Sequence, residues 1–310
     1  MRNALARRDL LRNVALAAAA MVLPRALGAC APVPRAAPAA SPESERLARW
    51  VAALRRGGPA TGATPLGHAA VRVGELASGS PYEAQTLEAY LLAGGSPAEE
   101  PLTLSLMHFD CVTLVEACLA VARVSEMEGA PGWERFGREV ERMRYRGGER
   151  TGYASRLHYF SEWIADGERR GLLQDLGAEL GGIADTRPLR FMSEHRSSYP
   201  ALADEATYER IGAIERSLDG QPRHVVPAAR IAEVAGRIES GDVLAFATSI
   251  EGLDVTHAAF AYRDARSVLR VLHAPLSGGV VEVTGATLTE YVTAIRRSTG
   301  ILVARPLRTA

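Results

Sequence analysis

The sequence contains no lysine: all 36 of its basic residues are arginine, in a chain of 310 residues. This absence excludes a P-loop lysine, a Schiff base with pyridoxal phosphate, and serine–lysine acyl transfer. Together with the abundant alanine, glycine and arginine, it is most simply explained by codon bias. The formal net charge is zero, which argues against a protein built to bind nucleic acid, because a basic face is the usual sign of that function.

Cysteine is also scarce, with three residues at Cys30, Cys111 and Cys118. Three cysteines without C-x-x-C spacing do not make a disulfide framework. Cys111 and Cys118 are unlinked if they share a helix, because seven residues of helix separate their Cα atoms by about 10 Å. Histidine pairs with the spacing of zinc ligands are absent, so the sequence predicts neither a metal site nor a cofactor.

The N-terminus resembles an export signal. Arg7-Arg8-Asp9-Leu10-Leu11 precedes an apolar stretch at 14–23, which is too short to span a bilayer and suits the core of a signal peptide. The twin arginine followed by two leucines is similar to a Tat signal. Leu27-Gly28-Ala29-Cys30 is similar to a lipobox, which predicts lipidation of Cys30; ordinary signal-peptide cleavage nearby is the alternative.

These features predict the organisation of the chain. Residues 1–30 form the signal peptide, and 31–43, rich in alanine and proline, form an extended tether. Residues 44–310 form a single domain, which we expect to be a monomer. The protein is then exported to the periplasm or cell envelope and held at a membrane through the lipid on Cys30.

Hydrophobic periodicity predicts an α+β fold. Helical spacing of apolar residues extends over 44–56, 112–127, 133–143, 154–166 and 204–218. Past Gly241-Asp242 the pattern changes to short β-type segments at 243–247, 255–262, 268–273 and 280–283, then a helix at 288–296 and a strand at 301–304. Helices followed by a meander of strands predict N-terminal helices packed on an antiparallel sheet.

Asp110-Cys111 stands at the start of the helix predicted over 112–127. A helix N-terminus favours a thiolate, and its unpaired N–H groups can stabilise an oxyanion. Asp110 suits the N-cap position, although its carboxylate opposes thiolate formation. Cys111 is therefore the candidate nucleophile, with a buried packing role as the alternative. Cys118, in the middle of the helix among apolar residues, fits only the packing role.

Two histidines on consecutive predicted strands supply a candidate base. His257 lies within 255–262 and His273 ends 268–273. Adjacent antiparallel strands can place both side chains side by side on one face, where one imidazole transfers protons and the other orients it. The alternative for each is a hydrogen-bonded histidine of the core. Among the other histidines, only His158 has a partly comparable setting.

The set of motifs resembles one family. Phe109–Glu116 (FDCVTLVE), Ser155–Ile164 (SRLHYFSEWI), Gly241-Asp242-Val243, Gly252–His257 (GLDVTH) and Leu272-His273-Ala274 are its matching segments, within about residues 80 to 305. Together they are similar to the NlpC/p60 papain-like cell-wall hydrolases, in particular to their N-acetylmuramoyl-L-alanine amidase-like branch, catalogued as a domain of unknown function.

This resemblance implies a papain-like α+β fold with Cys111 as nucleophile, His257 as general base and acid, and His273 as orienter. It also implies cleavage of the bond between N-acetylmuramic acid, in its ordinary or 1,6-anhydro form, and L-alanine, with peptidoglycan fragments (muropeptides) as substrates. The chain departs from the family at Ala258-Ala259-Phe260, where Val-Gly-Ile or similar is usual; this bears on substrate fit more than on chemistry.

Four further residues are candidates to hold sugar or peptide: Asp110, Arg156, His158 and Tyr159. In a helix over 154–166, Arg156 and Tyr159 share a face. The alternatives are core packing for Tyr159 and a structural glutamate as the partner of Arg156. Two rival functions stay open, an endopeptidase cutting γ-D-glutamyl-diaminopimelate bonds and an inactive lipoprotein that binds cell-wall fragments.

Overall fold

The computed structural model describes residues 41–57, 65–276 and 279–308. The predicted signal peptide, Cys30 and the tether as far as residue 40 lie outside these ranges, and so do predictions that rest on them. Helix α1 (Pro42–Arg56) begins two residues before the predicted start at 44, with Pro42 at its first position and Ser41 capping the amide of Ser44. The described residues all belong to one unit, 40–310.

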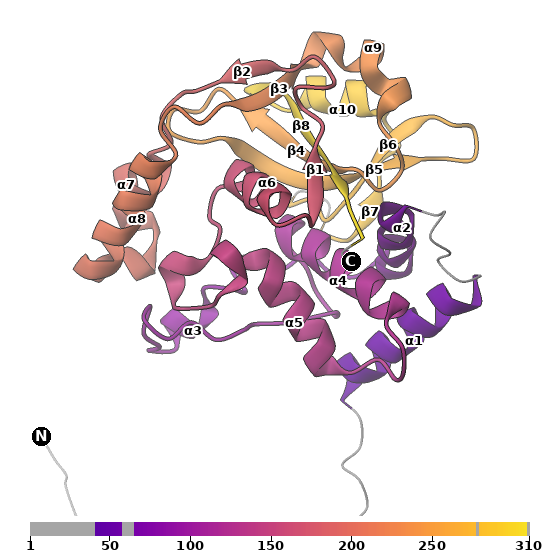
Figure 1. Ribbon diagram of the computed structural model, residues 1–310, viewed down its shortest axis with the longest axis horizontal. Helices are drawn as coiled ribbons and strands as arrows, with labels where there is room; N and C mark the ends of the chain where they lie inside the picture. Colours follow the sequence, from indigo (N-terminus) through magenta and orange to yellow (C-terminus); the bar gives the residue numbers. More distant parts are fainter. Residues whose placement is uncertain (1–40, 58–64, 277–278, 309–310) are drawn as a thin grey trace, which may run out of the picture. The chain divides into compact units, whose positions relative to one another are not determined.

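One antiparallel sheet organises the described part of the chain (Figure 1). Its strands are β1 (Leu173–Asp175), β2 (Ile183–Asp185), β3 (Arg223–Pro227), β4 (Val243–Thr248), β5 (Val255–Arg263), β6 (Leu269–His273), β7 (Glu282–Val283) and β8 (Ser298–Pro306). They follow the order β2-β3-β8-β4-β5-β6-β7, and β1 pairs with β8. The central strand β4 is buried along its whole length, as expected for a strand covered on both faces.

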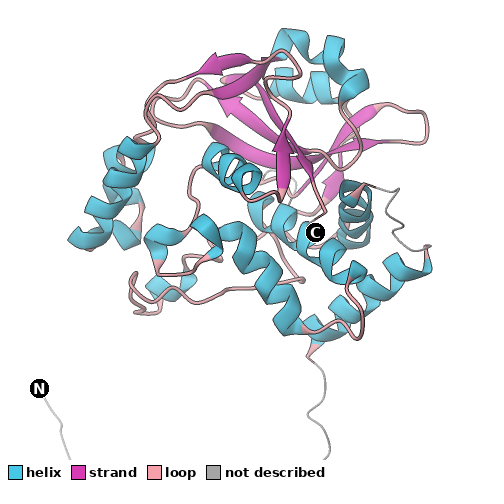
Figure 2. Cartoon of the chain, viewed as in Figure 1, coloured by secondary structure: helices cyan, strands magenta, loops and turns pink. Residues whose placement is uncertain are grey.

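Helices cover both faces of this sheet (Figure 2). Residues of β4 alternate between the two sides: Val243, Ala245 and Ala247 join the core beneath α4 (Cys111–Glu126), whereas Leu244 and Phe246 join the core beneath α10 (Leu288–Ala294). The remaining helices are α2 (Leu66–Ala77), α3 (Ala89–Leu92), α5 (Trp133–Arg144), α6 (Phe160–Arg169), α7 (Phe191–Glu194), α8 (Glu205–Ser217) and α9 (Ile231–Val234). The predicted α+β arrangement of helices on an antiparallel sheet is confirmed.

Helix α4 is enclosed by its neighbours α1, α2, α5 and β5, and nearly every residue from Leu114 onward is buried. The contact of α2 with the start of β4 is close: a Cβ on Gly67 would lie 2.7 Å from the carbonyl oxygen of Gly241. Gly241 itself has φ +92°, a conformation that side chains disfavour. Two glycines therefore set the packing distance between α2 and the sheet.

The helix predicted over 154–166 is wrong in its first half. A single 3₁₀ turn spans Tyr153–Ser155, Arg156 is extended, and α6 begins only at Phe160. Pairing with another segment of the chain keeps these residues extended. Arg156 forms an isolated β-bridge with Tyr145, and the amide of Leu157 donates to the carbonyl of Arg144. Arg156 and Tyr159 therefore do not share a helical face.

Within residues 41–57, 65–276 and 279–308, no helix has the length and apolar character needed to cross a membrane.

Candidate active site

Cys111 is the first residue of α4, and Asp110 is its N-cap. One carboxylate oxygen of Asp110 accepts from the amide of Thr113 at 2.7 Å, and the hydroxyl of Thr113 accepts from the amide of Asp110 at 2.9 Å. This capping box fixes the first turn of the helix. It gives Asp110 a structural role at the site, while its predicted contact with substrate stays a prediction.

The Cys111 thiol is half-buried. Burial and the neighbouring Asp110 carboxylate raise its pKa to about 12, against the lowering effect of the backbone N–H groups of Ala258, Cys111 and Val112. The thiol is therefore protonated at neutral pH until a base removes its proton. These three N–H groups, from α4 and β5, favour a negative charge that develops on the sulfur.

His257 and His273 are brought together as predicted. The register of β5 and β6 pairs Phe260 with Leu272, which sets the two imidazoles diagonally on one face of the sheet. His257 Nε2 lies 2.7 Å from His273 Nδ1. The His257 ring stacks on Phe246, with centroids 5.5 Å apart and an interplanar angle of 13°.

Both imidazoles are neutral at neutral pH. Burial, and then the neighbouring His273, lower the pKa of His257 to about 3, and burial lowers the pKa of His273 to about 4. A neutral imidazole can take a proton from a neutral thiol as the sulfur attacks, so charge develops only during the reaction. Because Ala258, whose backbone N–H acts on the Cys111 sulfur, directly follows His257, we treat Cys111, His257 and His273 as one candidate cluster. Their roles as nucleophile, base and orienter stay predictions.

Two tyrosines adjoin this cluster that the sequence reasoning missed. The Tyr291 hydroxyl, from α10, lies 3.2 Å from His273 Nδ1, and burial and then the Cys111 and Glu282 charges raise its pKa to about 12. Tyr82 forms a parallel bridge with Phe109, and burial, Cys111 and Asp110 raise its pKa. For Tyr291 the only available signal was its place in the predicted helix 288–296.

Arg156 is buried against two glutamates. Its guanidinium lies 2.6 Å from the carboxylate of Glu88 and 3.4 Å from that of Glu100, and its Cζ lies 4.7 Å from the centre of the Tyr153 ring. Burial raises the pKa of Glu100, against the lowering effect of Arg156. Of the two partners open for Arg156, a structural glutamate is the one found.

His158 and Tyr159 also contact protein groups away from the cysteine–histidine cluster. His158 Nε2 lies 2.9 Å from the carbonyl oxygen of Tyr153, and burial holds its pKa well below the ordinary value. The Tyr159 hydroxyl donates to Glu215 at 2.6 Å and is buried in the core beside α8. The core-packing role of Tyr159 is thus observed, and substrate contacts of both residues stay predictions.

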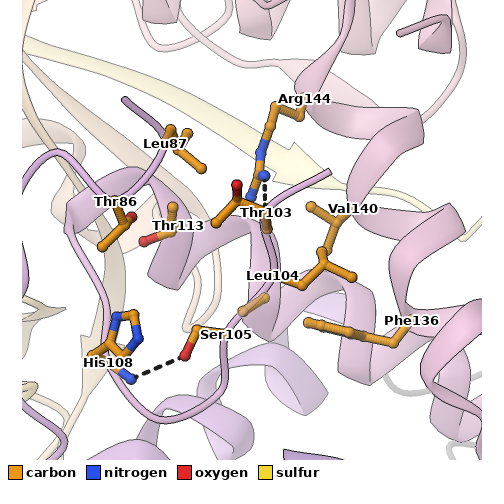
Figure 3. A pocket seen from close by; sticks show the side chains of 11 residues that line it. Thr86, Leu87, Thr103, Leu104, Ser105, His108, Thr113, Phe136, Val140 and Arg144 are labelled. Carbon is orange, nitrogen blue, oxygen red and sulfur yellow. Dashed lines mark hydrogen bonds between the residues drawn. The ribbon is translucent and has the colours of Figure 1, made fainter. Parts of the chain in front are cut away.

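A separate cavity lies beside α4 (Figure 3). Thr113 and Ala117 of α4 and Phe136, Val140 and Arg144 of α5 form much of its wall. Arg144 donates to the carbonyl oxygen of Thr103 at 2.6 Å, and its partner at 2.7 Å is the buried carboxylate of Glu116. Since the wall contains neither histidine of the cluster nor Cys111, this cavity is distinct from the candidate active site.

In the described ranges, no group of three or more histidine, cysteine or acidic side chains is arranged to hold a metal ion.

The buried neutral histidines predict that the protein loses stability in mild acid. The unfolded chain binds protons at imidazoles below pH 6.5, while the folded chain excludes them until about pH 4 at His273. The free energy of unfolding should therefore fall as the pH drops from 6.5 to about 4, by about 3 kcal/mol for His273 alone. Thermal or urea unfolding of wild type and His273→Asn across this range measures the difference; equal slopes would contradict it.

The fold and cluster together define an α+β protein with a thiol at a helix start and two linked imidazoles on adjacent strands of the sheet. The AmiA-like, or N-acetylmuramoyl-L-alanine amidase-like, family model matches residues 72–301. The chain belongs to this family, and the predicted amidase-like branch is confirmed.

Solved structures agree with this assignment. An N-acetylmuramoyl-L-alanine amidase from Bacteroides uniformis is 31% identical, with a TM-score of 0.72, over 78% of this chain and 99% of the other. A Bacteroides fragilis protein described as a xylanase is 32% identical, with a TM-score of 0.68, over 75% and 99%. A Legionella pneumophila protein shares the fold at 18% identity, with a TM-score of 0.61, over 86% and 94%. The comparison with curated proteins gives no match.

Proposed function

We propose that this protein is a cysteine N-acetylmuramoyl-L-alanine amidase acting on muropeptides. It cleaves the amide between N-acetylmuramic acid, in its ordinary or 1,6-anhydro form, and L-alanine. The observation that carries the proposal is the arrangement at the start of α4. The Cys111 thiol faces the N–H of Ala258, the residue after His257, and His257 is joined to His273 at 2.7 Å. Membership of an amidase-like family of peptidoglycan hydrolases supplies the class of substrate.

The acylation step uses these groups in order. Nδ1 of His257 takes the thiol proton as the sulfur of Cys111 bonds to the lactyl carbonyl carbon, and the carbonyl electron pair moves onto oxygen. N–H groups at the start of α4 hold this oxyanion. The oxyanion collapses, the carbon–nitrogen bond breaks, and His257 returns its proton to the amine of L-alanine. A thioester between Cys111 and the muramyl lactate is left.

Deacylation repeats the proton transfers with water. His257 takes a proton from water as its oxygen attacks the thioester carbon, and the second oxyanion expels the thiolate, which recovers the proton. The products are a free lactyl carboxylate and a peptide with a free L-alanine amine. We also propose that the domain belongs to the papain-like NlpC/p60 superfamily, on the basis of a helix-start cysteine next to the backbone of β5 and a linked pair of histidines on β5 and β6.

The test of bond choice is mass spectrometry of the products from defined intact and anhydro-muropeptides. We expect a stem peptide that begins with a free L-alanine amine and a sugar that keeps its lactyl carboxylate. A sugar still carrying L-Ala-D-Glu would instead show the γ-D-glutamyl-diaminopimelate endopeptidase. Binding of fragments with no product from either substrate would show an inactive binding protein. Both of these results contradict the proposal.

We keep the exported location as part of the proposal, with the lipid on Cys30 as the membrane anchor and the domain as a monomer. The export and the lipid anchor are proposed from the twin-arginine and lipobox-like segments of the sequence. The exported location also suits the proposed substrate, because muropeptides arise in the cell envelope.

A further inference from the structure

His273 is the more deeply buried of the two histidines, and one of its ring nitrogens, Nε2, has no part in the proposed reaction. His273 is only 1% exposed. Its Nδ1 contacts His257 and Tyr291, whereas its Nε2 is buried without a hydrogen-bond partner in the described ranges. A buried imidazole nitrogen of this kind is costly unless some group stabilises its N–H or its lone pair.

Glu282 is placed to act on this nitrogen. It stands directly opposite His273 in the antiparallel register of β6 and β7. One carboxylate oxygen lies 3.9 Å from Nε2, and the Glu282 side chain is 48% exposed. This separation is too long for a direct hydrogen bond, so the carboxylate acts on the imidazole through its charge.

The position of the proton on His273 decides whether His257 can be a base. If His273 carries its proton on Nε2, its Nδ1 accepts from Nε2–H of His257, and Nδ1 of His257 keeps a free lone pair for the thiol proton. In the other tautomer, Nδ1–H of His273 donates to Nε2 of His257. Neutral His257 then carries its proton on Nδ1 and cannot take another from the thiol.

The surrounding charges favour the productive tautomer. The titratable groups that face His273 are His257 from β5, Tyr291 from α10 and Glu282 from β7. Of these three groups, Glu282 alone is a carboxylic acid. An N–H directed at a carboxylate is attracted to it, whereas a lone pair there is repelled. On the opposite side of the ring, His257 Nε2–H and the Tyr291 hydroxyl can both donate to an unprotonated Nδ1.

We propose that Glu282 is a positioning residue that holds His273 in the Nε2–H tautomer and thereby keeps His257 ready to accept the Cys111 proton. The residues of the proposed reaction then form a linear series of four, Cys111, His257, His273 and Glu282. This inference rests on the proposed function, since it assigns a role within that reaction. Glu282 touches neither the nucleophile nor, in the proposed steps, the scissile bond.

The test compares three variants of the full chain. Glu282→Gln keeps the shape of the side chain and removes its charge, and with the charge it removes the attraction that favours an N–H at Nε2. We expect kcat for muropeptide hydrolysis to fall about 10- to 100-fold, the range typical of removing an outer partner of a functional histidine, with KM unchanged. Glu282→Asp should recover part of the loss. Glu251→Gln is the charge-matched control, because Glu251 is exposed in the turn between β4 and β5 and should leave kcat at the wild-type value.

A second measurement is independent of the substrate. Nitrogen NMR of the labelled imidazoles at neutral pH reports which nitrogen of each ring carries the proton. We expect His273 protonated at Nε2 in the wild type and in Glu251→Gln, and a shift toward protonated Nδ1 in Glu282→Gln. An unchanged tautomer spectrum in Glu282→Gln, or an unchanged kcat, would overturn the inference. If the wild type cleaves a different bond, the proposed function fails while this spectrum still decides the role of Glu282.

Discussion

Replacing Cys111 by alanine is expected to lower the rate of muropeptide hydrolysis by about 10⁴-fold or more, the scale seen when a covalent nucleophile is removed. The reason is that, in the proposed mechanism, Cys111 is the group that forms the thioester, and without it His257 could only activate water. The cap of α4 is made by Asp110 and Thr113, so the substitution should leave the helix start and the unfolding transition close to those of the wild type.

Cys118 offers a control on the same helix. It is 1% exposed, belongs to the apolar core, and has a pKa raised by burial alone. Cys118→Ala should therefore keep wild-type kcat and lose about 1 kcal/mol of stability, as is usual for a small core truncation. Product release measured by mass spectrometry, together with urea unfolding of both variants, separates the two roles. Full activity in Cys111→Ala would refute the nucleophile assignment.

The sequence could predict this part of the site because it depends on local pattern and short connections. The apolar face from Leu114 onward locates α4 and so places Cys111 at a helix start. The β-type segments containing His257 and His273 follow one another closely, and consecutive strands with short connections usually pair. Pairing of neighbouring strands then brings the imidazoles onto one face. Both steps use only hydrophobic periodicity and the length of the connection between the strands.

The other parts of the fold and of the site depend on contacts between segments that are distant in sequence. Hydrophobic periodicity does not report such contacts. Helix α2 contains Gly67 and Gly74, which weaken a helical signal but allow close packing on Gly241 and Leu272. Strands β1 and β2 have three residues each, too few to show alternation. Tyr82 reaches the cluster through an isolated bridge in irregular chain. The position of Glu282 follows from the β6–β7 register, which a two-residue strand does not reveal in sequence.

Arg156 is a second example of a position that sequence periodicity predicts wrongly. Its contacts also lead to the second prediction, which concerns the stability of the fold. Its segment has a helical pattern, yet the chain is extended there because it pairs with Tyr145. That conformation places the guanidinium between Glu88 and Glu100. Since burying a charge is costly without a partner, the three charged groups depend on one another. A substrate-binding arginine would instead keep its guanidinium accessible to the ligand's carboxylate.

Arg156→Met is accordingly expected to destabilise the fold by about 3–5 kcal/mol, the usual cost of leaving a buried charge without its partner. Glu100, whose pKa burial already raises, should bind a proton in this variant, because the arginine that lowers its pKa is gone. Adding Glu100→Gln should therefore recover part of the loss, which urea unfolding of both single variants and the double variant will measure as a coupling energy.

Arg138→Met provides the matched control, because Arg138 pairs with Glu134 on the exposed face of α5 and such pairs contribute less than about 1 kcal/mol.

Enzyme kinetics decide whether Arg156 has a structural or a substrate-binding role. A structural arginine leaves KM unchanged in the fraction of Arg156→Met that stays folded, whereas a substrate-binding one raises KM without a loss of stability. The second result would return Arg156 to the substrate site and would require Glu88 and Glu100 to release it when muropeptide binds.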